Sequence, residues 1–177
     1  MIDNSPIGVV DMLAARVEQT LGTSYWYLTE FSTSYRVPHV HRQFLPKRRS
    51  DDTSDEATDR MPFVHIFNPK GTIPNFRDKQ VELEVALRFC GWDADDDAQG
   101  WRIAMSMLWA VVLDLTAQTI LGAWQLIPEL SYEVPYDPQP PYWEALLNTK
   151  WRSATVMVQT LTPRMPGVKD YGNIHSH

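Results

Sequence analysis

Four aspartates crowd one short stretch of the sequence, RFCGWDADDDAQGW at residues 88–101: Asp93, Asp95, Asp96 and Asp97. Acids at positions 1, 3 and 5 are what an EF-hand-like calcium loop requires. The same loop needs glycine at position 6 and glutamate at position 12, where this chain has Ala98 and Ala104. A magnesium site, which needs only one or two carboxylates, stays open. We expect instead a turn that leads into a helix, with Asp97 as the helix N-cap.

Two histidines could also bind a metal, because His39 and His41 would project from the same side of a strand. No third ligand follows at a useful spacing, although His65 could lie near them in space. The single cysteine, Cys90, stands beside Gly91 at the expected end of a strand. The chain contains no G-x-S-x-G elbow and no glycine-rich phosphate loop. We therefore predict a protein that is not an enzyme, with no catalytic residues, no metal ligands and no cofactor.

The composition predicts one folded domain with extended appendages. The 177 residues are 44% hydrophobic, and seven Trp and seven Tyr suit large contact surfaces as well as a core. A net charge of −6 argues against nonspecific nucleic-acid binding by the whole surface. The N-terminus lacks the features of a signal peptide, which predicts a cytoplasmic origin. The longest apolar segment, residues 103–121, carries Asp114 and is expected to be a buried helix, not a membrane span.

The first half of the chain alternates between helical and strand patterns. A helix is expected over residues 6–21, because Ser5 can cap it, Pro6 suits its first turn and Gly22 ends it. Strands are expected over residues 24–37, 39–45, 61–71 and 81–89, with Pro69, Gly71 and Pro74 breaking the third. The 81–89 strand alternates apolar residues with largely polar ones, which indicates one buried face.

A long helix that is apolar nearly all round is predicted over residues 98–121. One sheet covers only one of its faces, so the first helix or another subunit must cover the rest. A strand over 124–137, a short helix over 140–151 and a strand over 153–161 complete the pattern. The sequence thus predicts an α+β domain, residues 1–162, in which a largely antiparallel β-sheet packs with one long and two shorter helices.

Two appendages have a different composition. Residues 46–60 contain no large apolar residue and place a basic cluster before an acidic one, which predicts a long, mobile charged loop. This loop could be a solvated hairpin tip, an arm that orders against a neighbouring subunit, or the lining of a pore. Its basic cluster, residues 47–49, also leaves nucleic-acid contact open. Residues 163–177 have two prolines, two glycines and no periodicity, which predicts an extended C-terminal arm.

The order of elements carries a resemblance to a known family. A one-sided strand ends in Gly-Trp-Asp at residues 91–93, and the long helix WRIAMSMLWAVVLDL follows. The stretch SYEVPYDPQPPYWEALLNTKW and the closing strand ATVMVQTL come next, and YDPQPPYW is the most specific part. Residues 61–162 in this respect resemble the tail terminator, or tail completion, proteins of long-tailed bacteriophages. In that family a small protomer forms a six-membered ring at the head-proximal end of the tail tube and has no catalytic residues.

The resemblance implies a structural subunit of the virion, located in the tail or neck and assembled in the host cytoplasm. It implies a homo-oligomeric ring, a hexamer, that stops tube polymerisation and joins the tail to the head connector. The other partners expected are the tail tube protein, a head connector or neck protein, and DNA that passes through the lumen. No contact with a membrane is expected. Two alternatives stay open: a head-completion or stopper protein of the neck, and a metal-dependent enzyme that uses Asp93 to Asp97 or His39 and His41.

Two sets of residues are candidates for contacts in such a ring. The charged loop would face the lumen or the tube through Arg48, Arg49, Asp51, Asp52, Asp55 and Glu56. The candidate subunit interface comprises Glu82, Glu84, Trp101, Trp109 and Trp143. The two glutamates share the polar face of a strand, where an interface is as well supported as solvent. The tryptophans are included because large aromatic side chains suit contact surfaces.

Overall fold

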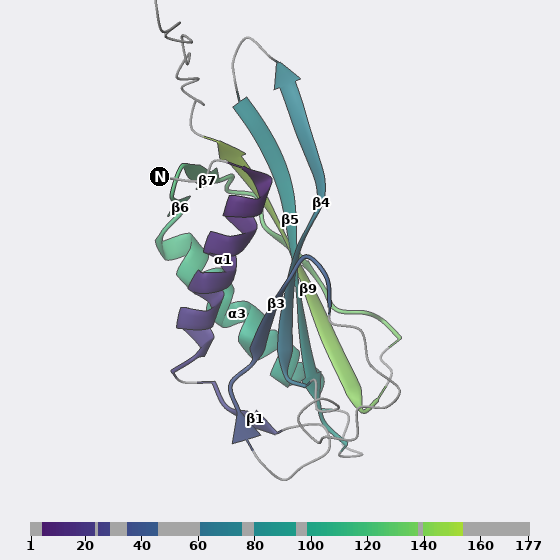
Figure 1. Ribbon diagram of the computed structural model, residues 1–177. Coiled ribbons are helices and arrows are strands. Elements are labelled where there is room, and N and C mark those ends of the chain that lie inside the picture. The colour runs from purple at the N-terminus through teal and green to yellow at the C-terminus, as the bar shows by residue number, and fades with distance from the viewer. Residues whose placement is uncertain are drawn as a thin grey trace, which may run out of the picture.

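The computed structural model describes residues 5–23, 25–28, 35–45, 61–75, 80–94, 99–137 and 140–153. Over these residues the chain is an α+β fold, with a curled, mostly antiparallel sheet and two helices (Figure 1). The elements are α1 (Pro6–Leu21), β1 (Tyr27–Leu28), β2 (Tyr35–Arg36), β3 (His39–Arg42), β4 (Phe63–Asn75), β5 (Gln80–Trp92), α3 (Trp101–Ala117), β6 (Ile120–Leu121), β7 (Trp124–Leu126), β8 (Ser131–Glu133) and β9 (Tyr142–Ser153).

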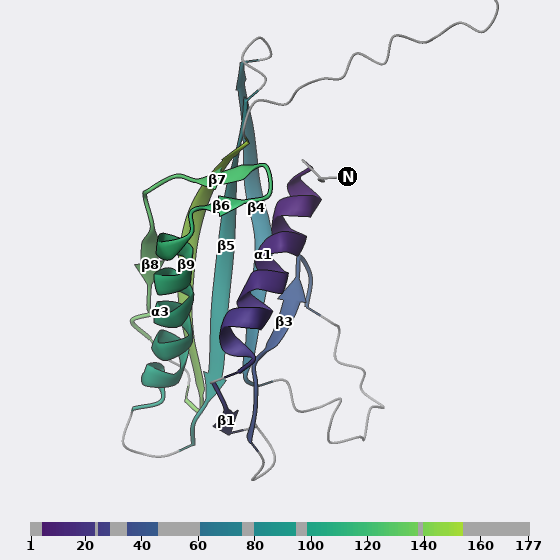
Figure 2. The same cartoon turned by 90° about the vertical axis from the view of Figure 1, so that its left-hand side faces the viewer.

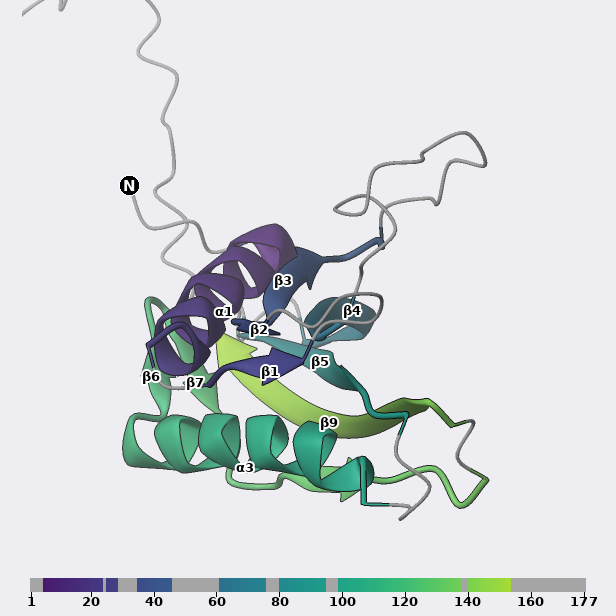
Figure 3. The same ribbon diagram turned by 90° about the horizontal axis from the view of Figure 1, so that it is seen from below.

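The main sheet has the strand order β3-β4-β5-β9-β7-β6, and β8 also pairs with β9. Only the pair β3–β4 is parallel, and every other described pair is antiparallel, as predicted. The longest regular ladder joins β5 to β9, from Glu82 opposite Arg152 to Trp92 opposite Tyr142. Both helices lie on the same face of this sheet (Figures 2 and 3). The sheet therefore has one face committed to the core and one face without a described helix.

The core lies between the helices and the two central strands. Alternate residues of β5 and β9 point toward the helices and are buried: Leu83, Val85, Leu87, Phe89, Ala145, Leu147 and Trp151. Two polar groups buried with them are paired. The Trp151 indole N–H donates to Thr149 Oγ1 over 2.8 Å, and the Thr149 hydroxyl donates to the Val85 carbonyl over 2.8 Å. These bonds let an otherwise apolar layer hold polar atoms without leaving them unsatisfied.

Helix α1 confirms the prediction for residues 6–21. Ser5 caps it, because its side-chain oxygen accepts from the Gly8 N–H over 3.1 Å, and Gly22 ends it. The residues on its inner face recur every four positions and are all buried: Val9, Leu13, Val17 and Leu21. This spacing places them on one side of the helix, which explains why the helix lies flat on the sheet.

Arg16 interrupts that stripe and links α1 to the end of α3. Its Nε donates to Asp114 Oδ2 over 2.6 Å, and its two terminal nitrogens donate to the Asp114 and Gln118 carbonyls over 2.7 and 2.8 Å. The Asp114 carbonyl also accepts from the Gln118 N–H over 3.1 Å, so Arg16 is a second donor to it. A cation at this end of α3 also favours the negative end of the helix dipole. Arg16 therefore acts as a clamp between the two helices.

The short helix predicted over residues 140–151 is wrong, because these residues form most of β9. The prolines at 140 and 141 suggested a helix start. The residues that follow alternate in burial with a period of two, which is the pattern of a strand. Only that pattern lets β9 pair along β5 and bury alternate side chains under α3. The part of the chain that the structure describes thus has two helices, where the sequence predicted three.

The break predicted in the third strand is also wrong. Strand β4 runs through Pro69, Gly71 and Pro74 to Asn75, with irregular register between Phe67 and Lys70 and between Thr72 and Asn75. Strand β3 pairs with β4 only from Phe63 to Ile66, so the remainder of β4 is an edge of the sheet. A proline at an edge or a bulge removes no hydrogen bond that the ladder needs, so the strand tolerates both prolines.

Several boundaries differ from those predicted. Helix α3 starts at Trp101 with Gly100 as N-cap and no side-chain cap, so Asp97 does not cap it, and residues 120–121 form β6 instead of helix. The segments 24–37 and 124–137 each contain two short strands where one was predicted. The charged loop 46–60, the C-terminal arm 163–177 and the predicted strand 153–161 beyond Ser153 lie outside the described residues. In the described ranges no helix is long and apolar enough to cross a membrane.

The hydrogen bonds between Arg16 and the end of α3 predict that removing this side chain destabilises the protein. Arg16→Ala should lower the free energy of unfolding by about 1.5–3 kcal/mol, because hydrogen bonds to a charged group are worth about that much. Arg152→Ala is the matched control, since it removes an exposed ion pair with Glu82, and such pairs contribute less than about 1 kcal/mol. Urea denaturation followed by tryptophan fluorescence measures both. An equal decrease in the free energy of unfolding for the two variants would contradict the proposed role of Arg16.

Candidate functional site

The three histidines singled out from the sequence come together on the face of the sheet that carries no helix. His39 and His41 lie on β3, and His65 on β4 stands directly opposite His41. The His39 and His41 rings lie 6.3 Å apart, Phe63 lies 5.7 Å from His41, and Phe67 lies 4.8 Å from His65, measured between ring centroids. No group of three His, Cys, Asp or Glu among the described residues is arranged to hold a metal ion.

His65 is already engaged within the chain. Its Nε2 lies 3.2 Å from the Gln43 carbonyl oxygen, and a carbonyl can only accept, so this nitrogen carries the proton. The pKa of His65 lies below its ordinary value, mainly because the ring is partly buried. The hydrogen bond to Gln43 raises this pKa, and the positive charge of nearby Arg88 lowers it. The ring is therefore neutral at pH 7, and its Nε2 donates to the backbone.

Cys90 is buried on the same face, paired in register with Phe63 on one side and Glu144 on the other. Burial raises the pKa of its thiol to about 12, although Arg88 acts in the opposite direction. The thiolate is the nucleophile in cysteine chemistry, so a thiol with so high a pKa is inert at neutral pH. Cys90 thus packs as a small apolar side chain in the sheet.

Asp93 is the one member of the aspartate cluster inside the described residues, since Asp95 to Asp97 fall outside them. Its backbone joins the end of β5 to the start of β9. Its N–H donates to the Pro141 carbonyl over 2.9 Å, and the Trp143 indole N–H donates to the Asp93 carbonyl over 3.3 Å. Gly100 completes the junction, because a Cβ there would lie 2.2 Å from the Trp143 indole nitrogen. Asp93 and Gly100 therefore both pack against the start of β9.

The five candidate interface residues divide into two groups. Trp143 is buried inside the protomer, and Glu82 is bonded to the Arg152 guanidinium over 2.7 Å on the open face of the sheet. Glu84 is exposed on that face, in register with Lys150. Trp101 and Trp109 remain on the molecular surface, with 40% and 51% of their area exposed. The structure does not bring the five residues together on one surface.

Helix α3 carries an apolar stripe, which we call the outer stripe: Trp101, Met105, Trp109 and Leu113. Met105 is partly buried against the core, and the other three side chains are exposed. These residues recur every four positions, so they follow one side of the helix. Leu113 is 57% exposed, more than either tryptophan of the stripe. The opposite side of α3 faces the core, where Met107, Leu108, Val111 and Leu115 are buried. Figure 2 views the helices from outside, and no described helix or strand lies over α3 from that side.

The candidate interface predicted from the sequence did not include Leu113. An all-round apolar helix gives no periodicity from which its outer face can be read. The six candidate residues of the charged loop, Arg48, Arg49, Asp51, Asp52, Asp55 and Glu56, lie outside the described residues. The outer stripe is therefore the best-defined candidate contact surface in the described part of the chain.

The burial of the only cysteine predicts a slow labelling reaction. A thiol reagent at pH 8 should modify native Cys90 at least about a thousandfold more slowly than free cysteine, because each pKa unit changes the thiolate fraction about tenfold. The same protein unfolded in urea is the control and should react at the rate of an ordinary thiol. Fast stoichiometric labelling of the native protein would show that Cys90 is accessible and would reopen a nucleophilic role.

The sequence matches no protein-family model, and no curated protein matches it significantly.

Proposed function

We propose that this chain is a structural subunit of a phage virion, of the tail-terminator type, that assembles with further copies of itself into a ring. The observation that carries the proposal is the outer stripe of α3. Exposed aromatic and aliphatic side chains that gather on one side of a rigid element are typical of protein–protein contacts. Trp109 lies near the middle of the stripe, where an interface tryptophan contributes most to binding.

A second exposed apolar group supports a head-to-tail contact between subunits. Ile7 in the first turn of α1 is 70% exposed, and Phe44, just after β3, is 80% exposed. Ile7 lines a shallow hollow together with Arg42 and Gln43 at the end of β3. In Figure 2, β3 and α3 lie on opposite sides of the molecule, with α1 between them. Each subunit thus offers two different exposed apolar surfaces on different elements, one on α3 and one at the start of α1 and the end of β3.

Two different surfaces on each subunit are what a closed ring of this kind requires. An interface between unlike surfaces is heterologous, and it generates a ring when the rotation between neighbours closes. In the proposed ring the outer stripe of one subunit packs against the Ile7–Phe44 surface of the next. The face of the sheet without helices then carries polar groups, among them the Arg88–Glu144 pair, whose Nε–Oε2 distance is 2.6 Å. Such a surface suits contacts at the rim of an interface or with solvent.

The proposed mechanism is geometric and involves no chemical step. One side of the ring would match the last ring of the tail tube, and the other would block further stacking and present a surface to the head connector. DNA would pass through the lumen during ejection, and acids of the charged loop facing it would repel the phosphates. A head-completion or stopper subunit of the neck would close its ring through the same surfaces. Binding to purified tail tubes, as opposed to purified connectors, distinguishes the two functions.

Charge substitutions in the two apolar surfaces test the ring. Trp109→Glu and Ile7→Glu should each abolish assembly, because a carboxylate in the centre of an apolar interface cannot be solvated or paired. Gln125→Glu is the matched control: it adds one negative charge at an exposed position on β7 and should assemble normally. Native mass spectrometry on each purified variant, and on tails assembled with it, measures the outcome.

Mixing the two defective variants makes the test specific for a heterologous contact. Each variant retains one intact surface, so an equimolar mixture should form heterodimers and nothing larger. Monomers alone in the mixture, or rings formed by either single variant, would contradict the proposed contact.

A further inference from the structure

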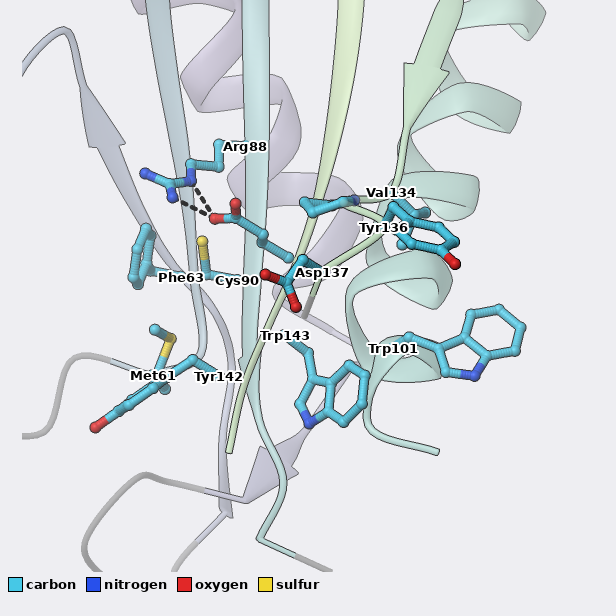
Figure 4. Close-up of a pocket in the computed structure, with 12 residues that line it drawn as sticks. Met61, Phe63, Arg88, Cys90, Trp101, Val134, Tyr136, Asp137, Tyr142 and Trp143 are labelled. Carbon is cyan, nitrogen blue, oxygen red and sulfur yellow. Dashed lines mark hydrogen bonds and ion pairs between the residues drawn. The ribbon is translucent and has the colours of Figure 1, made fainter. Parts of the chain in front are cut away.

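A pocket of about 670 Å³ lies where β9 begins. Its walls come from three regions that are distant in sequence: the paired ends of β4, β5 and β9, the first residue of α3, and the segment 134–137 that follows β8 (Figure 4). This pocket is separate from the Ile7–Phe44 surface, and it shares only Trp101 with the outer stripe. None of the roles proposed above uses its interior.

Aromatic side chains dominate the wall. Phe63, Trp101, Tyr136, Tyr142 and Trp143 all line the pocket. Aromatic faces carry partial negative charge and attract cations, most strongly when water is excluded. The chain already shows one such contact beside the pocket, because the Arg102 guanidinium lies 5.8 Å from the centroid of the Trp101 ring. Of the four other aromatic residues in the wall, Phe63 and Trp143 are buried, and Tyr136 and Tyr142 are exposed.

The charges of the lining favour a cation as well. Arg88, Glu144 and Asp137 are the charged residues in the wall. Arg88 and Glu144 neutralise one another through their ion pair. Asp137 makes no hydrogen bond or ion pair with the described residues, and Figure 4 shows its carboxylate between Arg88 and the Trp143 ring. Among the described residues, the carboxylate of Asp137 is thus the one charge of the wall without a partner.

We propose that this pocket receives an arginine side chain of a partner protein, with the guanidinium paired to Asp137. Arginine fits better than lysine, because its planar, weakly hydrated guanidinium stacks on aromatic rings and binds a carboxylate through two parallel hydrogen bonds. The methylene groups of its stem pack on the apolar wall. This site is an addition to the proposed function and does not depend on it, since the pocket belongs to a single protomer.

A capped Gly-Arg-Gly tripeptide is the probe, and the same peptide with citrulline is its neutral, nearly isosteric counterpart. The measurement is two-dimensional ¹H–¹⁵N NMR of the indole N–H signals, assigned with Trp101→Phe and Trp143→Phe variants. The arginine peptide should shift the signals of Trp101 and Trp143 in a saturable way, and the citrulline peptide should not. Asp137→Asn should weaken the binding about tenfold, the value of one charge-assisted hydrogen bond.

Glu84→Gln is the control for a general loss of negative charge, since Glu84 is exposed and does not line this pocket. It should leave the affinity unchanged. Asp137 is exposed, so its substitution should not disturb the fold, and an unchanged NMR spectrum elsewhere verifies this. Equal shifts with both peptides, no shift at either indole, or equal weakening by Asp137→Asn and Glu84→Gln would each overturn the proposal.

Discussion

The ladder between β5 and β9 is the interaction on which the rest of the structure depends. It pairs the two strands from Glu82–Arg152 to Trp92–Tyr142, and it fixes which side chains point to each face. One face is buried under α1 and α3 and supplies the core. Because side chains alternate along a strand, the same register places the ion pairs Glu82–Arg152 and Arg88–Glu144 on the opposite face. A shift of one residue would bury those charges and expose the core.

This ladder can bury only one side of α3. The apolar surface on the other side of that helix favours association with another subunit. Helix α1 packs along one flank, where Arg16 holds the two helices together. Trp109 and Leu113 stay exposed, at a cost of roughly 25 cal/mol for each Å² of apolar surface left in water. A neighbouring subunit that covers the outer stripe removes this cost. Association would thus bury the apolar surface of α3 that a single protomer leaves exposed to water.

The sequence predicts a secondary-structure element correctly where its local signals agree with one another. In α1 the cap residues and the apolar period coincide, and in β5 the alternation is regular, so both elements were predicted with nearly correct ends. Strand β9 was missed because Pro140 and Pro141 resemble a helix start, and only its partner β5 decides otherwise. Trp101 and Trp109 were candidates as aromatic residues, but an all-round apolar helix does not reveal its outer side. The Asp137 pocket had no local signal, since distant segments build it.

The mass of the purified wild-type protein across a concentration series, from native mass spectrometry with electron-microscopic images of the largest species, tests the ring most directly. If the outer stripe packs against the Ile7–Phe44 surface of a neighbour, closed rings of identical subunits should form, either in solution or on the ends of added tail tubes. Monomers at every concentration, with and without tubes, would contradict it. So would a two-fold symmetric dimer joined stripe to stripe, because that contact uses one surface twice and cannot close a larger ring.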